Sequence, residues 1–172
     1  GLSTDRLFQQ YRDDADQQSG DKVRNDGNVS KALASANKVI EAEYTVPFLA
    51  HATMEPQNCI AHVQADRCDI WAPSQGPDLA TVVAANITGL KHQQIHIHSS
   101  FLGGGFGRRI LHDYLAEAVS ISSAIGQPVK VIWSREDDIA HDSFRPATYN
   151  RLKAGITNEG QLLAWQHQLV GP

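Results

Sequence analysis

The sequence predicts an α/β (α+β) protein in which helices pack on a mixed sheet. Three observations lead to this class. Short segments of alternating apolar and polar residues, typical of strands, recur from residue 38 onward. Two longer segments between them have the apolar spacing of helices. The connections include a short hairpin as well as strand–helix–strand crossovers, so a purely antiparallel or purely parallel sheet is not expected.

The amino-terminal segment, residues 1–38, is polar and rich in Asp and Gln, and it is predicted to be a partly helical linker or lobe. A first helix is expected here, capped by Ser3 or Thr4. Its apolar face consists of Leu7, Phe8 and Tyr11. A second, short helix capped by Ser30 is expected to run through Ala36. This segment contains no motif that indicates a function.

From residue 39 the pattern becomes rich in strands. The expected strands are 39–46, 59–63, 68–72, 94–99, 129–133, 149–156 and 161–170, and the expected helices are 78–88 and 110–125. Gly126 is the expected left-handed cap of the second helix, with Pro128 just beyond it. Residues 158–160 form the expected hairpin turn between the last two strands.

Composition excludes several classes of protein. The net charge is −4, 41% of the residues are hydrophobic and 20% are charged, which is the range of ordinary globular proteins and not of disordered chains. A nucleic-acid-binding protein that depends on bulk positive charge is excluded. No apolar run is long enough to span a membrane. The chain starts at Gly1 and stops at Pro172 directly after a predicted strand, so we expect it to be part of a longer protein, or a processed or cloned segment.

The most informative segment is the glycine-rich loop at residues 101–109, between a predicted strand and a predicted helix. Four glycines in five positions let the backbone approach a ligand closely, and Arg108 and Arg109 add cationic groups that suit phosphate. The dinucleotide fingerprint fails because Arg108 occupies the position of its third glycine, and the phosphate-binding P-loop fails because no Gly-Lys-Ser/Thr follows. A tight turn without a ligand stays an alternative.

Four motifs, in order along the chain, give the sequence a family resemblance. They are His51-Ala52-Thr53-Met54-Glu55-Pro56, Trp71-Ala72-Pro73-Ser74-Gln75, Gly103-Gly104-Gly105-Phe106-Gly107, and Gly126-Gln127-Pro128-Val129-Lys130 with Ser134-Arg135-Glu136-Asp137. Together they resemble the molybdopterin-binding large subunit of the xanthine dehydrogenase and aldehyde oxidase family. The pair Arg108-Arg109 is most similar to the isoquinoline 1-oxidoreductase β-subunit branch. The resemblance implies that residues 39–172 are the first part of a molybdopterin-binding domain.

The resemblance also implies a reaction, a cofactor and partners. Members of the family hydroxylate an aldehyde or an N-heterocyclic carbon with oxygen from water. Their molybdenum is held by the dithiolene of a molybdopterin, here expected in the dinucleotide form, and not by protein side chains. Electrons leave through [2Fe–2S] clusters, expected on an iron–sulfur small subunit. A bacterial protein of the cytoplasm or the periplasm is compatible with this reading.

The resemblance also implies a set of site residues. Gln75 aligns with a glutamine whose side-chain amide hydrogen-bonds a molybdenum oxo group, a role that suits a neutral donor. Glu55 aligns with a signature glutamate near the site, where either a positioning role or direct contact is open. The residues that align with the cofactor-binding segment are Gly104, Gly105, Phe106, Gly107 and Arg108.

Two departures from the family pattern shape the functional hypothesis. Ile110 occupies the position of a substrate-binding glutamate in xanthine oxidisers, so purines are disfavoured and an aldehyde or aromatic substrate is favoured. The family's catalytic glutamate belongs to a later segment, so we expect this chain to be inactive by itself. Two other classes stay open: a nucleotide- or phosphate-binding module that uses residues 103–109, and a non-catalytic assembly domain.

Other chemically suggestive residues have simpler interpretations. His92, His96 and His98 lack identifiable further metal ligands, so we expect polar strand residues. His51 is expected to pack or to form hydrogen bonds. Cys59 and Cys68 are expected to be small, partly buried residues. The acidic run 135–138 is expected to be a solvated turn and helix start.

Overall fold

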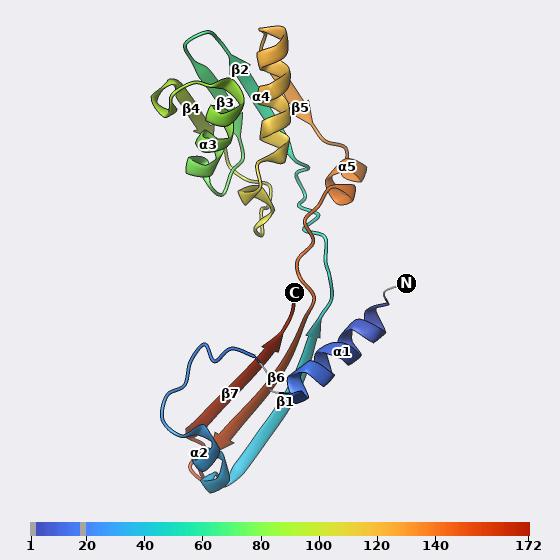
Figure 1. Ribbon diagram of the computed structural model, residues 1–172, viewed down its shortest axis with the longest axis vertical. Helices are drawn as coiled ribbons and strands as arrows, with labels where there is room; N and C mark the ends of the chain where they lie inside the picture. Colours follow the sequence, from blue (N-terminus) through green and yellow to red (C-terminus); the bar gives the residue numbers. More distant parts are fainter. Residues whose placement is uncertain (1–2, 18–19) are drawn as a thin grey trace. The chain divides into compact units, whose positions relative to one another are not determined.

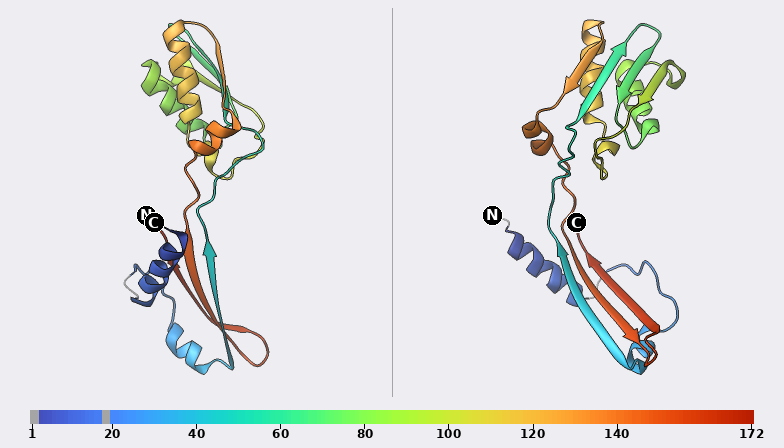
Figure 2. Two further views of the ribbon diagram at one scale, coloured as in Figure 1. Left: turned by 90° about the vertical axis from the view of Figure 1, so that its right-hand side faces the viewer. Right: turned by 180° about the vertical axis from the view of Figure 1, so that it is seen from behind.

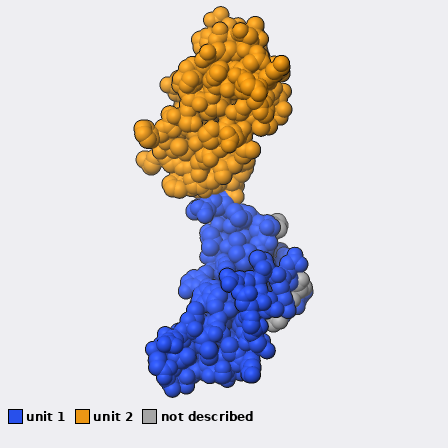
Figure 3. Space-filling model, turned by 90° about the vertical axis from the view of Figure 1, so that its left-hand side faces the viewer, with its two compact units in different colours: residues 1–49, 145–172 blue, residues 50–144 orange. Residues whose placement is uncertain are grey.

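The computed structural model describes residues 3–17 and 20–172 and divides the chain into two compact units. The terminal unit contains residues 1–49 and 145–172, and the central unit contains residues 50–144 (Figure 3). The chain therefore leaves the terminal unit after Leu49 and returns to it at Arg145. The predicted boundary at residue 38 does not coincide with these units, because the first strand pairs with strands from the end of the chain.

The terminal unit is a three-stranded antiparallel sheet with two helices (Figure 1). Its strands, in the order β1-β6-β7, are β1 (Lys38–Val46), β6 (Thr148–Ile156) and β7 (Leu162–Val170). Helices α1 (Thr4–Gln17) and α2 (Val29–Ser35) lie on the same face of this sheet (Figure 2). The buried core between α1 and the sheet contains Tyr11, Ala15, Ala147 and Tyr149.

Both predicted amino-terminal helices form, but the cap of α2 differs from the prediction. The Asn28 side chain, not that of Ser30, accepts a hydrogen bond from the backbone N–H of Lys31 at 2.9 Å. Asn is among the best residues for this position because its short side chain reaches the exposed N–H groups of the first turn. Ser30 lies inside the helix.

The central unit is a four-stranded mixed sheet in the order β4-β3-β2-β5. Its strands are β2 (Asn58–Val63), β3 (Cys68–Ala72), β4 (Ile95–Ser99) and β5 (Val129–Ile132). β3 pairs in parallel with β4, whereas β2 pairs antiparallel with β3 and with β5. The predicted α/β (α+β) class with a mixed sheet is confirmed, although the strands among the described residues form two sheets.

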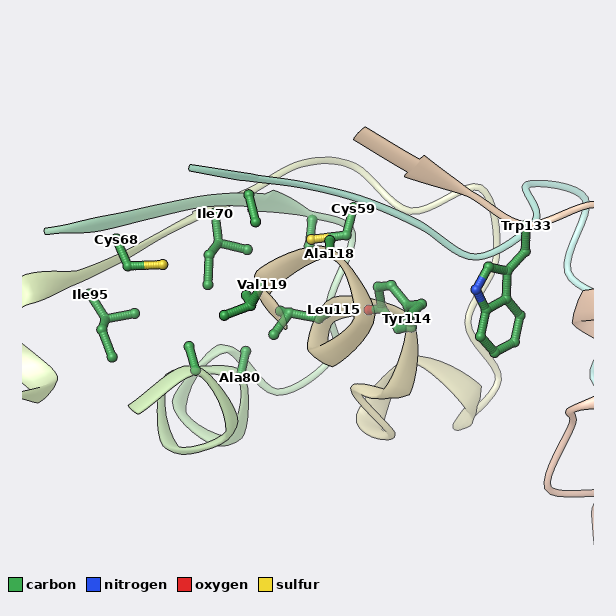
Figure 4. Close-up of a cluster of buried hydrophobic side chains, with 13 residues drawn as sticks. Cys59, Cys68, Ile70, Ala80, Ile95, Tyr114, Leu115, Ala118, Val119 and Trp133 are labelled. Atoms are coloured by element: carbon green, nitrogen blue, oxygen red, sulfur yellow. The ribbon is translucent and has the colours of Figure 1, made fainter. Parts of the chain in front are cut away.

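Two helices, α3 (Pro77–Thr88) and α4 (Asp113–Ile125), cover one face of the central sheet (Figure 2). Alternate strand residues such as Cys68 and Ile70 point toward these helices, and α4 contributes Leu115 and Val119 (Figure 4). Both cysteines are free thiols, and both are more deeply buried than expected. Burial raises the pKa of Cys59 to about 12 and that of Cys68 to about 11.

Helix α4 starts three residues later than the apolar pattern indicates. A 3₁₀ turn (Arg108–Ile110) follows the glycine loop, and Leu111 is then extended, with φ −79° and ψ 127°. The α-helix therefore begins only at Asp113, and it ends at the left-handed Gly126 as predicted. A short helix, α5 (Arg135–Ala140), follows β5. In the part of the chain that the structure describes, no helix is both long and apolar enough to cross a membrane.

Candidate functional site

The glycine loop follows β4 and packs closely on two other segments of the central unit. A Cβ atom at position 103 would lie 2.3 Å from the Cβ of Glu55, and one at position 105 would lie 2.6 Å from Oε1 of Gln75. Only glycine permits this approach. Gly104 and Gly107 also have φ near +104°, and Phe106 has φ +56°, which is strained for a residue with a side chain. The loop is thus held in one unusual conformation.

Gln75 is anchored to this loop by its amide oxygen. Oε1 accepts hydrogen bonds from the backbone N–H groups of Gly107 at 3.0 Å and of Arg109 at 3.3 Å. Because backbone N–H groups can only donate, the oxygen must face the loop and the NH₂ group must face away. Gln75 is exposed, and its Nε2 has no hydrogen-bond partner among residues 3–17 and 20–172. The site therefore presents a fixed, neutral pair of N–H donors.

Glu55 ties the beginning of the loop to the segment before β2. Its Oε2 accepts hydrogen bonds from the N–H of Gly103 and from Arg109, both at 2.9 Å, and its Oε1 accepts one from Asn58 at 3.0 Å. The backbone N–H of Glu55 also donates to the carbonyl of Gly103. With its acceptors used in this way, Glu55 holds the loop in position. This geometry favours the positioning role over direct contact.

The expectation that Arg108 and Arg109 present cationic groups to phosphate is wrong for their side chains. Both are buried, with relative exposures of 1% and 0%. Arg108 forms a two-point pair with Asp113 at 3.0 and 2.8 Å, and Arg109 donates to Glu55 and to the carbonyl of Gly104. A buried guanidinium is stable only with such partners. The arginines brace the loop from inside.

Residues at the start of α4 form hydrogen bonds with the segment that carries Gln75. Ser74 Oγ lies 2.8 Å from Nε2 of His112, and the hydroxyl of Tyr114 donates to the carbonyl of Pro73 at 2.8 Å. Burial lowers the pKa of His112, so its imidazole is neutral near pH 7 and its Nε2 can accept a hydrogen bond from the Ser74 hydroxyl. Sequence reasoning missed this contact because the partners are far apart along the chain.

His51 forms hydrogen bonds, as expected, within a buried cluster. Its Nδ1 lies 2.9 Å from Oδ1 of Asp142, whose side chain is 1% exposed. Arg108 Nε lies 3.2 Å from the same oxygen. Nε2 of His51 is the nearest atom to the position that a Cβ on Gly107 would occupy, at 3.7 Å. The cluster therefore reaches the glycine loop.

The acidic run 135–138 is only partly the solvated turn that its sequence indicates. Ser134 caps the helix: its Oγ accepts a hydrogen bond from the backbone N–H of Asp137, whose carboxylate accepts one from the backbone N–H of Ser134. Asp138, however, is buried and pairs with Arg135 at 2.7 Å. Arg135 also donates to the carbonyls of Thr53 and Met54, which lie next to Glu55. The run therefore helps to fix the segment on which the loop rests.

Two histidines, His96 and His98, lie on β4. His98 stacks on Trp71, with the ring centroids 4.7 Å apart, and its Nε2 lies 2.9 Å from Asp69. His96 is exposed on the same strand. Across residues 3–17 and 20–172 no three His, Cys, Asp or Glu side chains gather as a metal site would require. His98 thus has a hydrogen-bonded, stacked position of the kind expected for a polar strand residue.

The model of the molybdopterin cofactor-binding domain family matches residues 12–171 of this chain. Among curated proteins, the membrane-bound aldehyde dehydrogenase [pyrroloquinoline-quinone] of Gluconacetobacter polyoxogenes is 33% identical over 147 residues, covering 85% of this chain and 19% of the relative. Isoquinoline 1-oxidoreductase subunit beta of Brevundimonas diminuta is 40% identical over 121 residues, covering 69% and 16%. The chain spans less than a fifth of the length of these two relatives.

Solved structures share the fold. The aldehyde oxidoreductase of Desulfovibrio gigas matches with a TM-score of 0.71 at 23% identity, covering 84% of this chain and 16% of that one. The CO dehydrogenase of Oligotropha carboxidovorans matches with a TM-score of 0.67 at 24% identity, covering 82% and 18%. The chain belongs to the molybdopterin cofactor-binding domain family. Within it, the relatives are aldehyde oxidoreductases and xanthine dehydrogenases, so the resemblance read from the four motifs is confirmed.

Proposed function

We propose that this chain is part of the large subunit of a molybdenum hydroxylase that oxidises an aldehyde or an N-heterocyclic aromatic substrate with oxygen from water. When bound, the molybdenum–molybdopterin cofactor supplies the two-electron oxidation. The chain's own residues bind and orient that cofactor. Supporting this proposal, one relative is named an aldehyde dehydrogenase and another an isoquinoline 1-oxidoreductase.

The single observation that carries the proposal is the amide of Gln75, anchored by its oxygen to the backbone of the glycine-rich loop. The absence of a Cβ at Gly105 leaves room for Gln75, whose oxygen is held by the loop and whose NH₂ faces outward. A neutral donor can bind an electron-rich cofactor atom without competing for the metal. Gly104, Phe106 and Gly107 continue the same backbone surface. The residues present therefore fit a cofactor that brings its own metal ligands.

Arg108 enters this proposal through its backbone and not through its guanidinium. Its N–H donates to the carbonyl of Gly105 at 2.9 Å, which closes the turn that carries Phe106 and Gly107. The buried side chain supplies a compensated positive charge beneath the loop. Glu55 supports the other end of the loop in the same way. We propose that both residues position the cofactor-binding backbone.

The surface beside the loop favours an apolar substrate. Phe106 is 66% exposed and Ile110, at the position where xanthine oxidisers carry a glutamate, is 45% exposed. Neither side chain can donate or accept a hydrogen bond, so a purine would leave its polar edge unsatisfied there. An aldehyde or a largely apolar aromatic ring has fewer polar groups to satisfy. This difference supports the proposed substrate class.

We further propose that the cofactor is the dinucleotide form and that electrons pass to [2Fe–2S] clusters on an iron–sulfur small subunit. A cluster of this kind needs four cysteine ligands, and the chain has two cysteines, both buried. The names of two relatives, a subunit beta and a molybdenum-binding subunit, indicate that those proteins have further subunits. The isolated chain is expected not to retain the full cofactor and not to turn over.

A nucleotide- or phosphate-binding module is the weaker alternative, because both arginine side chains that would bind phosphate are buried and paired. A non-catalytic assembly domain predicts neither cofactor nor oxidation.

The test is a substrate panel on the longest natural protein that contains this chain, with its partner subunits. Oxidation of aldehydes or N-heteroaromatics in preference to hypoxanthine, and its loss in Gln75→Leu, is the expected result. A protein that oxidises only purines contradicts the substrate class, and stoichiometric molybdenum with turnover in the isolated 172-residue chain contradicts the expected inactivity.

A further inference from the structure

The buried cluster of His51, Asp142 and Arg108 determines which ring nitrogen of His51 carries the proton. This ring lies beside the glycine loop. Asp142 accepts hydrogen bonds from the backbone N–H of His51 and from Nδ1 of its ring, and Arg108 Nε lies 3.2 Å from Asp142 Oδ1. A carboxylate can only accept, so Nδ1 must carry the proton of the His51 ring. In the neutral ring Nε2 is then a hydrogen-bond acceptor.

This acceptor has no partner within the central unit. No hydrogen bond reaches Nε2 of His51 from any residue in the described ranges, 3–17 and 20–172. The side chain is nevertheless 9% exposed and rigidly held by Asp142. Nε2 is also the sole atom within 4 Å of the position that a Cβ on Gly107 would occupy, leaving chain neighbours aside. The ring nitrogen therefore borders open space at the loop.

Gly107 thus lies between two fixed polar groups of opposite kind. Its N–H is bound to Oε1 of Gln75, whose outward NH₂ is a donor. On the side where its Cβ would project, it faces the Nε2 acceptor of His51. A small number of polar groups of defined direction is characteristic of a small-molecule site. A pterin ring system carries both acceptors and N–H donors, so it has groups that can pair with either of these two side chains.

We propose that His51 is a further cofactor-binding residue, whose Nε2 accepts a hydrogen bond from an N–H or O–H group of the bound cofactor beside Gly107. This inference rests on the proposed function. Asp142 and Arg108 act through His51 by fixing its tautomer and orientation, in the way that second partners orient metal-ligating histidines.

The test uses two substitutions that separate the two ring nitrogens. His51→Asn places an amide donor near the position of Nδ1 and keeps the contact with Asp142, but has nothing at Nε2. His51→Gln carries an amide oxygen to the position of Nε2 and loses the Asp142 contact. His96→Asn is the matched control, because His96 is an exposed histidine on β4. All three are made in the longest natural protein that contains this chain.

Molybdenum and pterin retained per chain after dialysis, together with the melting temperature, are the measurements. We expect His51→Asn to melt close to wild type but to bind cofactor roughly threefold to tenfold more weakly, the size of one hydrogen bond. His51→Gln should melt lower yet retain more cofactor than His51→Asn. Wild-type retention in His51→Asn, or equal loss in both variants, overturns the inference and leaves the proposed function standing. A wild-type protein without molybdenum or pterin overturns both.

Discussion

The substitution Gly105→Ala tests the anchoring of Gln75 directly. The new Cβ would lie 2.6 Å from Oε1 of Gln75, against 3.4 Å for ordinary contact, so the amide must retreat by about 0.8 Å. Its hydrogen bonds to the N–H groups of Gly107 and Arg109, now 3.0 and 3.3 Å, would then break. Gly105 has an ordinary backbone conformation, so alanine adds no strain of its own.

The expected cost in unfolding free energy is small, about 1–2 kcal/mol, because each neutral hydrogen bond contributes about 0.5–1.5 kcal/mol and Gln75 can turn into solvent. Amide hydrogen exchange by NMR on the 172-residue chain is the assay. The N–H groups of Gly107 and Arg109 should exchange about fivefold faster or more. Gly76→Ala is the control, since its Cβ would have no neighbour nearer than 3.6 Å. Unchanged protection of both amides in Gly105→Ala would refute the anchoring.

Three further outcomes are expected. Glu55→Gln removes the carboxylate partner of buried Arg109 and should lower the unfolding free energy by ~2 kcal/mol. The loss is smaller than for a fully buried pair because the Glu55 side chain is 33% exposed. Urea denaturation measures it, with the exposed Glu159→Gln as control. Burial lowers the pKa of His112 below its usual 6.5, so just below that pH the unfolded chain binds more protons than the folded chain. The contribution of His112 to the unfolding free energy is therefore complete above pH 6.5 and is lost as the pH falls. An equal dependence of the unfolding free energy on pH in His112→Asn would contradict this. A nucleoside triphosphate should not raise the melting temperature of the chain, since the arginines near the loop are already paired. A saturable rise in melting temperature would favour the phosphate-binding alternative.

Local patterns in the sequence predicted most of the elements. Alternation placed the strands, and the Gly126 cap ended α4, because these features depend on neighbouring residues. The division into two sheets was not predicted. β1 pairs with β6, more than a hundred residues later, and no local pattern specifies such a partner. The start of α4 was predicted too early because the apolar side chain of Ile110 fits a helical pattern, although Ile110 lies in a 3₁₀ turn.

The motifs predicted which residues form the candidate site. They did not predict where a side chain points when a partner far away in the sequence determines its orientation. Gln75 and the glycines lie together as the motifs indicate. Arg108 and Arg109 were expected to face a ligand, but both side chains are buried and pair with the partly exposed carboxylates of Asp113 and Glu55. A buried guanidinium needs such a partner to offset the loss of its hydration. The contact of His51 with Asp142 links residues 91 positions apart, which sequence spacing cannot reveal.

The central claim is that this fold holds a molybdenum–pterin cofactor against the glycine loop and Gln75. The most direct test is the molybdenum and pterin content of the longest natural protein that contains this chain, measured by elemental analysis and by pterin fluorescence after release. The account predicts stoichiometric molybdenum and pterin in the wild type and a clear loss of both in Gly105→Ala, with Gly76→Ala unaffected. A pure, folded wild-type protein that contains neither molybdenum nor pterin would contradict it.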